Sequence, residues 1–141
     1  MSKFDLHQDI KSHIVTFLED IDLIIIKNGD ISAKYVQTFA KYGYLNILKY
    51  IIINMHFPVT IICEDNNMNI SEIICMEAAG GGNLDVLQWA REQGYSWNTR
   101  TCAGAARGGH LEILQWARAN GCEWDSWTCT FAAMYNHLDI L

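Results

Sequence analysis

The feature that most constrains the fold of this 141-residue chain is an internal repeat with a period of 27 residues. The stretch GGHLEILQWARANG at 108–121 matches GGNLDVLQWAREQG at 81–94, and HLEIL at 110–114 returns as HLDIL at 137–141. A weaker copy, FAKYGYLNILKY, begins 39 residues upstream of the segment that it matches. A fixed period of this length is typical of proteins that stack similar structural units in a row.

Each copy is predicted to contain two short helices. Before the first helix, an apolar residue precedes a Ser, Asn or Asp that can cap it, in the pairs Ile31-Ser32, Ile70-Ser71, Trp97-Asn98 and Trp124-Asp125. The apolar member can pack against the residue four positions after the cap, which is Val36, Cys75, Cys102 or Cys129. The second helix is expected to begin at Leu45, Leu84, Leu111 and Leu138. Gly121 is well placed to end such a helix.

The glycines between the two helices admit two interpretations. Glycines that precede a helix can cradle a phosphate at the helix N-terminus. However, no Lys-Ser or Lys-Thr follows Gly80-Gly81-Gly82 or Gly108-Gly109, and the outer copies have Tyr42-Gly43 and Tyr135-Asn136 at the same place. We therefore interpret the glycines as the turn between two packed helices of one repeat.

These residues resemble ankyrin repeats. GGHLEIL followed by GCEWD is similar to that family's pattern after the first helix, Ala105-Ala106 and Ala132-Ala133 match its alanine pair, and Thr101 and Thr128 match its leading threonine. The copies are about six residues shorter than an ordinary repeat of about 33, and TCAGAA replaces the Thr-Pro-Leu-His signature. Short repeats with a tryptophan in the second helix resemble the divergent ankyrin arrays of giant DNA viruses of amoebae. The resemblance implies an all-α, ankyrin-like helical repeat solenoid of helix-turn-helix units.

The chain divides into an N-terminal segment and a repeat region. Residues 1–30 are expected to form capping helices or a partial F-box-like segment, and residues 31–141 form the repeats. The repeats are 31–69, with a 12-residue insertion, 70–96, 97–123 and an incomplete 124–141. The insertion is interpreted as an elongated loop, with a binding finger as the alternative because its VTIIC stretch is apolar.

The N-terminal segment resembles the first half of an F-box, a motif that docks onto the adaptor subunit of cullin ubiquitin ligases. The resemblance implies that five apolar residues would dock the adaptor: Leu6, Ile10, Ile14, Phe17 and Leu18. His7 stands where the motif has proline, and the second half of the motif is missing. A plain capping helix pair would show the same amphipathic spacing.

The last repeat stops inside its expected second helix, and five residues are too few for a stable helix, so this helix should fray. A shortened array, a split or decaying gene product, and a domain that pairs through its open end are all compatible with this pattern.

No catalytic or metal-binding pattern stands out. Cys75, Cys102 and Cys129 occupy one repeat position, too far apart for disulfides, and no Cys-x-x-Cys pair suggests zinc. These cysteines are interpreted as small buried hydrophobes. His110 and His137 are exchanged for other residues in other copies, so they are interpreted as helix-start residues. We predict no enzyme activity, no cofactor and no metal.

The formal net charge is −6, which disfavours nucleic acid as a partner. The longest apolar runs are far shorter than the ~20 residues of a membrane helix, and Asp5 and Asp9 stand where a signal peptide would be apolar. We expect a cytoplasmic protein, in the host cell if it is viral, that is neither secreted nor membrane-bound.

The expected function is a non-enzymatic protein–protein interaction module that binds a host or viral protein. The alternative is an F-box/ankyrin adaptor that presents substrates to a cullin ubiquitin ligase. Repeat position alone indicates the partner-binding residues as Tyr95, Arg100, Ala103, Arg107, Glu123, Trp127, Thr130 and Met134. Trp97 and Trp124 are expected in the core instead.

Overall fold

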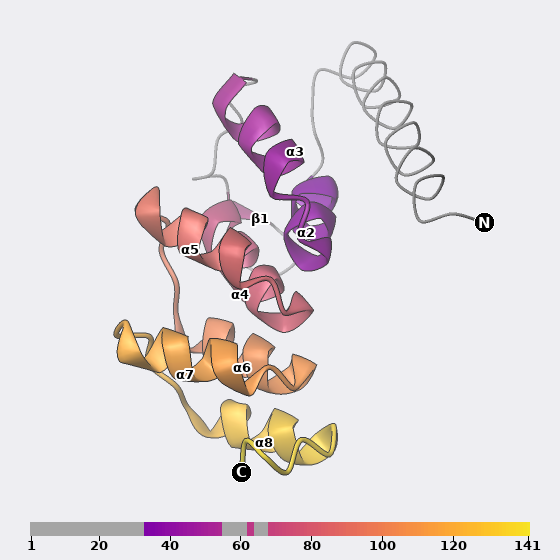
Figure 1. Cartoon of the computed structure of the whole chain (residues 1–141), viewed down its shortest axis with the longest axis vertical. Helices are drawn as coiled ribbons and strands as arrows, with labels where there is room; N and C mark the ends of the chain where they lie inside the picture. Colours follow the sequence, from indigo (N-terminus) through magenta and orange to yellow (C-terminus); the bar gives the residue numbers. More distant parts are fainter. Residues whose placement is uncertain (1–32, 55–61, 64–67) are drawn as a thin grey trace, which may run out of the picture. The chain divides into compact units, whose positions relative to one another are not determined.

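The computed structural model describes residues 33–54, 62–63 and 68–141, and this part of the chain is mostly α-helical (Figure 1). The elements in chain order are α2 (Ala33–Tyr42), α3 (Leu45–Lys49), a π-helical turn (Tyr50–Asn54), β1 (Ile62–Cys63), β2 (Met68–Asn69), α4 (Ile70–Gly81), α5 (Leu84–Glu92), α6 (Thr99–Gly108), α7 (Leu111–Ala119) and α8 (Ser126–Met134). The prediction of a mainly helical protein is confirmed.

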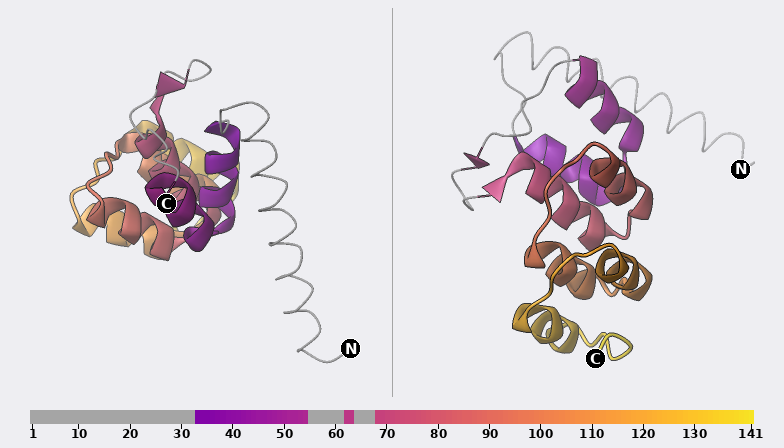
Figure 2. Two further views of the ribbon diagram at one scale, coloured as in Figure 1. Left: turned by 90° about the horizontal axis from the view of Figure 1, so that it is seen from above. Right: turned by 90° about the vertical axis from the view of Figure 1, so that its left-hand side faces the viewer.

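The helices form pairs that follow one another. α2 packs against α3, α4 against α5, and α6 against α7. α4 also packs between α2 and α6, and α6 packs in turn against α8, so the first helices of the pairs make one row. Figures 1 and 2 show this row from α2 to α8, with α5 and α7 along one side of it.

The core lies where each first helix meets its neighbours. The side chains of Phe39, Leu48, Ile74 and Leu87 are among the largest that are fully buried. In α6 the buried residues are small, because the helix backbones approach closely there. A Cβ atom added to Gly104 would lie only 2.7 Å from the carbonyl oxygen of Met76 in α4.

Side-chain caps begin the first helices, and one predicted cap is wrong. As predicted, Asn98 accepts a hydrogen bond from the Arg100 amide, and Asp125 accepts one from the Trp127 amide. For α4, however, the cap is Asn69 rather than Ser71. Asn69 and Glu72 form a reciprocal capping box, which satisfies two amides at once and therefore begins the helix earlier.

The joint between the two helices of a pair uses left-handed backbone, as the turn interpretation requires. Gly43, Gly82 and Gly109 have φ of 76°, 82° and 76°, and Asn136 has φ of 61° at the same place in the last copy. Glycine adopts this conformation at little cost, and asparagine is one of the few other residues that tolerates it. Gly121, with φ of 86°, follows α7 where its end was predicted.

Three of the four predicted second helices begin at the expected residues, which are Leu45, Leu84 and Leu111. The fourth prediction is wrong, because residues 138–140 form a turn instead of a helix. So few residues cannot offset the cost of helix nucleation.

The described part of the insertion is a short antiparallel pair of strands. β1 and β2 pair Ile62 with Asn69 and Cys63 with Met68, directly before α4. The other residues of the insertion lie outside the described part, as do residues 1–32 with the F-box-like positions Leu6 to Leu18 and the predicted cap Ser32.

Candidate functional site

A groove runs between α6 and α8 and reaches α4. Its volume is about 560 Å³, and its lining residues are Met76, Thr99, Arg100, Ala103, Gly104, Arg107, Asp125, Trp127 and Phe131. Three successive first helices contribute to it, so the groove depends on their packing side by side.

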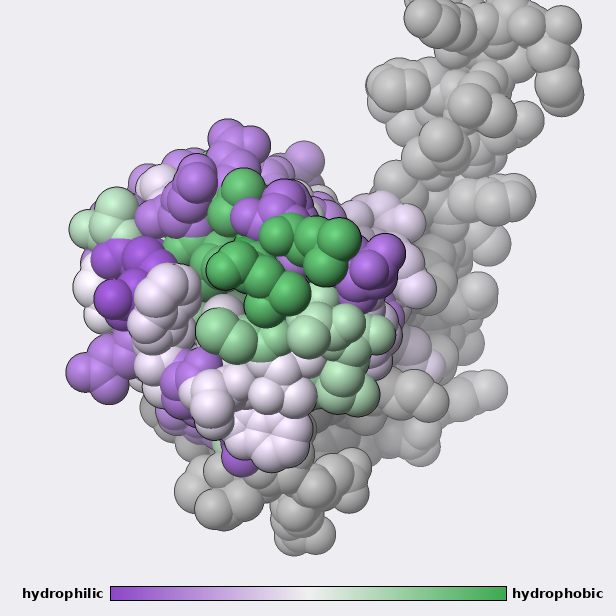
Figure 3. Space-filling model, turned by 90° about the horizontal axis from the view of Figure 1, so that it is seen from below, coloured by the Kyte–Doolittle hydropathy of each residue, from purple (hydrophilic) through white to green (hydrophobic). Residues whose placement is uncertain are grey.

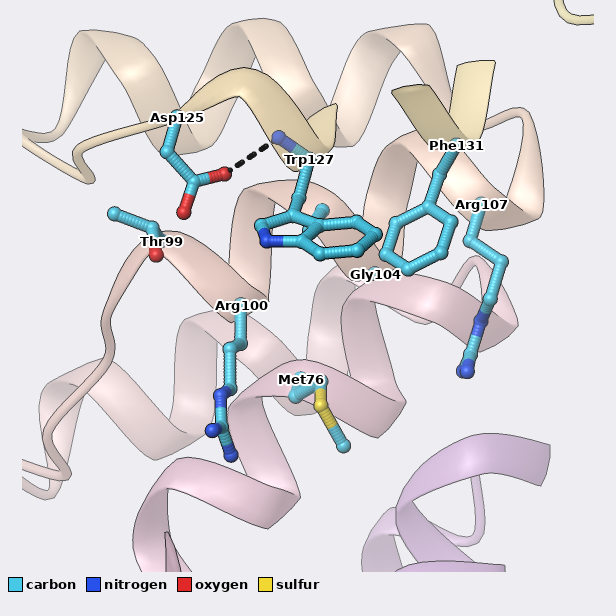
Figure 4. Close-up of a pocket in the computed structure, with 9 residues that line it drawn as sticks. Met76, Thr99, Arg100, Gly104, Arg107, Asp125, Trp127 and Phe131 are labelled. Atoms are coloured by element: carbon cyan, nitrogen blue, oxygen red, sulfur yellow. Dashed lines mark hydrogen bonds between the residues drawn. The ribbon is translucent and has the colours of Figure 1, made fainter. Parts of the chain in front are cut away.

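Two aromatic side chains from α8, Trp127 and Phe131, form one wall of the groove, and Tyr135, which follows the helix, packs on Phe131 outside the groove. The ring centroids of Trp127 and Phe131 lie 5.5 Å apart, and those of Phe131 and Tyr135 lie 6.4 Å apart. The three residues are spaced by four, which places them along one side of a helix. Trp127 remains 57% exposed, and Figure 4 shows its indole beside the ring of Phe131 within the groove.

Asp125 fixes the start of this wall. Its carboxylate accepts a hydrogen bond of 2.9 Å from the backbone amide of Trp127 (Figure 4). Because the cap orients the first turn of α8, it also sets the direction in which the indole leaves the helix.

Two arginines from α6 supply positive charge. Arg100 and Arg107 are seven residues apart, so they lie two turns apart on one face of the helix (Figure 4). Arg107 is 3.8 Å from the buried carboxylate of Glu77, which also accepts a hydrogen bond of 2.8 Å from Gln37. This chain of contacts links α2, α4 and α6 and holds Arg107 in place.

Four of the eight predicted partner-binding residues come together in the groove: Arg100, Ala103, Arg107 and Trp127. The other four do not line it. Tyr95 is buried, with its ring edge to face against Trp89 at 5.6 Å, and burial raises the pKa of its hydroxyl. Thr130 donates a hydrogen bond of 2.8 Å to the Ser126 carbonyl.

Glu123 and Met134 are exposed outside the groove. The sequence reasoning missed Met76, Thr99, Gly104, Asp125 and Phe131. Two signals could have found some of them: Phe131 is one helical turn after Trp127, and Met76 matches Ala103 in the repeat.

An arginine and a tryptophan recur one period apart, as Arg91 with Trp97 and Arg118 with Trp124, and each pair holds a loop in place. The guanidinium of Arg91 lies 4.2 Å from the ring centre of Trp97, and that of Arg118 lies 4.5 Å from Trp124. Arg118 also donates a hydrogen bond of 2.8 Å to the Cys122 carbonyl, and Arg91 bonds the Tyr95 carbonyl in the same way. Each arginine thereby closes the loop after its second helix.

The predicted core position of Trp124 is wrong, because its side chain is 52% exposed. Trp97 is only half-buried, and its ring packs edge to face against Trp116 of the following helix pair at 5.9 Å. No described residue stands against Trp124 in the way that Trp116 stands against Trp97.

The cysteines share a repeat position but not an environment. Cys75 and Cys102 are fully buried as predicted, whereas the prediction for Cys129 is wrong because it is exposed. Burial raises the pKa of Cys75 to about 12. A thiol contact with Cys122, together with burial, raises the pKa of Cys102. Among the described residues, no three His, Cys, Asp or Glu side chains group as metal ligands would.

The position before each second helix joins neighbouring pairs. Asn83 donates hydrogen bonds of 3.1 and 2.7 Å to the carbonyls of Ala40 and Lys41. Two repeats later, Nε2 of His137 lies 3.1 Å from the carbonyl oxygen of Arg107. Each residue therefore ties the joint of its own repeat to the end of the first helix in the repeat before it: Asn83 contacts the end of α2, and His137 contacts the end of α6.

None of the described helices has the length and hydropathy of a bilayer span. Comparison with protein-family models, with curated proteins and with solved structures finds no match to this chain.

Proposed function

We propose that the chain is a non-enzymatic protein–protein interaction module, built as an ankyrin-like helical repeat solenoid. Contacts that recur with the sequence period support the repeat architecture. Arg91 and Arg118, one period apart, close equivalent loops and stack on equivalent tryptophans. Asn83 and His137, two periods apart, contact equivalent carbonyls of the preceding helix pair. In such arrays the surface built by several repeats is the usual binding surface.

The groove between α6 and α8 is the proposed binding surface. The observation that carries this proposal is the exposed indole of Trp127, which lies in a groove that also contains Arg100 and Arg107. Tryptophan and arginine are enriched among the residues that dominate binding energy at protein interfaces. Most of an exposed indole can be removed from water by a partner at little cost in conformational entropy.

The chemistry of the groove defines the partner segment. An apolar side chain of the partner would pack on Trp127 and Phe131, and carboxylates beside it would meet the two arginines. The lining carries two arginines and one carboxylate, that of Asp125, so the charge of the lining residues is positive on balance. The proposed ligand is therefore a protein segment with an apolar anchor flanked by acidic residues.

A selection from random peptides tests this function. The full chain would be immobilised, and a displayed library of random peptides would be enriched on it. Trp127→Ala is expected to weaken binding of the selected peptides by about 30-fold or more, the loss typical of a hot-spot residue. Trp124→Ala is the matched control, because Trp124 is similarly exposed but lies outside the groove.

The same peptides should bind a variant that lacks residues 1–28 as tightly as they bind the full chain, since the proposed groove lies in α4, α6 and α8. If the selected peptides bind Trp127→Ala as tightly as they bind the wild-type chain, the groove is not the binding surface. A pull-down from cell extract that recovers a cullin adaptor with the full chain, but not with the variant that lacks residues 1–28, would favour the ligase-adaptor alternative.

A further inference from the structure

The outward face of α8, defined by Cys129 and Ala133, carries small residues at positions that are buried in the preceding first helices. The equivalent residues are Cys75 and Ala79 in α4 and Cys102 and Ala106 in α6. All four side chains are fully buried. The equivalent residues of α8, Cys129 and Ala133, are both exposed. α8 therefore retains a surface suited to close helix packing, and no described element covers it.

Large apolar side chains are exposed in the same part of the chain. Of the ten large hydrophobic residues that are exposed in the described part of the chain, six belong to residues 124–141. Trp127 lines the groove and Tyr135 packs on Phe131 beside it, which leaves Trp124, Met134, Leu138 and Leu141. Figure 3 looks onto this end of the molecule and shows hydrophobic surface gathered near the middle of it.

The area is close to what a specific dimer requires. Large side chains that are more than half exposed present about 100 Å² each, so these four present about 400 Å² in each copy. Two copies would bury about 800 Å² through them, and the small residues of α8 would raise this toward the about 1,000 Å² of a specific interface. A patch of this size is comparable to the largest apolar patch on a typical monomer, which is often a functional surface.

The charge pattern favours a second copy over a different partner. Between Asp125 and Asp139, residues 126–138 contain no Asp, Glu, Lys or Arg, so the charges of this region lie at the two ends of α8 and its following turn, away from Cys129 and Ala133 in the sequence. In a two-fold contact each residue near the axis faces its own counterpart, so a charged residue there would face a like charge. An uncharged helix face avoids this repulsion and is complementary to itself.

We propose that the outward face of α8 is the interface for a second copy of this chain, with α8 packed against α8 about a two-fold axis. The small side chains of Cys129 and Ala133 let the two helices approach closely, and the apolar residues around them are removed from water. Arg100 and Arg107 take no part, so the proposal does not depend on ligand binding in the groove.

Sedimentation of the full chain from about 1 to about 100 µM tests the proposal, because self-association depends on concentration. The wild-type chain is expected to shift from monomer to dimer. Ala133→Glu places two carboxylates in the interface and should leave a monomer throughout the range. Gln88→Glu adds the same charge at an exposed position of α5 and should dimerise like the wild type. A wild-type chain that remains monomeric, or a dimer that survives Ala133→Glu, would overturn the proposal.

Cross-linking gives a second result that does not depend on a disruptive variant. In a Cys63→Ser variant of the chain, a short bifunctional maleimide should join two copies through Cys129, because Cys75, Cys102 and Cys122 are buried. Adding Cys129→Ser to this variant should abolish the cross-linked dimer. Cross-linking that persists after Cys129→Ser is added, or oligomers that grow beyond two copies, would show that α8 does not form this two-fold contact.

Discussion

Two threonines occupy one repeat position and bury hydroxyls at a cost in stability. Thr101 and Thr128 are almost fully buried, and within the described residues their Oγ1 atoms have no hydrogen-bond partner. One repeat before Thr101, the equivalent residue is Ile74, which is also fully buried. An apolar branched side chain therefore fits this position, and desolvation of the hydroxyls lowers stability with no hydrogen bond to offset it.

Thr128→Val is accordingly expected to raise the free energy of unfolding by about 1 kcal/mol, since it removes an unsatisfied buried hydroxyl. Thr130→Val in the same helix is the control, because that hydroxyl is exposed and donates to the Ser126 carbonyl. Urea denaturation at neutral pH measures both. A lower midpoint for Thr128→Val than for the wild type would show that the buried hydroxyl has a partner.

The buried thiols predict a loss of stability in alkali. Burial raises the pKa of Cys75 from 9.0 to about 12. A thiol with a raised pKa is ionised more readily in the unfolded chain, so its stabilising contribution is complete below pH 9 and declines as the pH rises toward 12. At pH 10 the loss from this thiol is about 1.4 kcal/mol.

Urea denaturation at pH 7 and pH 10 measures this loss, and Cys75→Ala should reduce the difference between the two conditions. Equal free energies of unfolding at both pH values for the wild-type chain would contradict the account of these thiols.

At the scale of the helices, glycine sets how closely neighbouring first helices approach. A Cβ atom on Gly81 would lie 1.9 Å from the carbonyl oxygen of Lys41, and one on Gly108 would lie 2.3 Å from that of Gly80. These two contacts repeat the same geometry between α2 and α4 and between α4 and α6. The clash is with backbone, so a side chain at either glycine must push two helices apart.

Gly81→Ala is therefore expected to destabilise the chain by about 1–3 kcal/mol, although alanine favours helix by about 1 kcal/mol over glycine. Gly80→Ala is the matched control, because its nearest contacts would be 3.3 Å away. Thermal or urea unfolding should give Gly80→Ala a clearly higher free energy of unfolding than Gly81→Ala. Equal stability of the two variants would mean that the helices are not held at this distance.

Much of the helical layout could be predicted from the sequence, because the repeat fixes where equivalent helices begin. Leu84 and Leu111 each start a second helix, and Asn98 and Asp125 each cap a first one. The cap of α4 was missed because the insertion before it breaks the period, although Asn69 and Glu72 have the spacing of a capping box.

What the repeat pattern could not predict depends on neighbours rather than on residue type. Cys102 and Cys129 occupy equivalent positions in equivalent helices, yet of these two helices only α6, which carries Cys102, has a further described helix, α8, packed against it. The groove shows the same limit, since eight residues were chosen from repeat position, but which of them meet in one groove depends on how three first helices pack side by side.

At the scale of the whole molecule, the proposed repeat architecture makes each 27 residues one interchangeable structural unit. In a linear array each unit contacts only its neighbours, so stability is approximately a sum over units and their interfaces. Deletion of residues 97–123 would join Ser96 to Trp124 in the register that Ser96 and Trp97 have now. α8 would then pack on α4 in place of α6, with Phe131 and Tyr135 where α6 has Gly104 and Gly108, so the two helices would lie further apart than α4 and α6 do now.

Unfolding of the 97–123 deletion variant, followed by circular dichroism, tests the repeat architecture most directly. The variant should be helical and should unfold in a sharp transition with a lower free energy of unfolding than the full chain, because one unit and one interface are lost. Deletion of residues 97–109 removes half a period, and this control should unfold the chain or broaden its transition. A 97–123 deletion that loses its helical structure, or a half-period deletion that folds equally well, would contradict the repeat architecture.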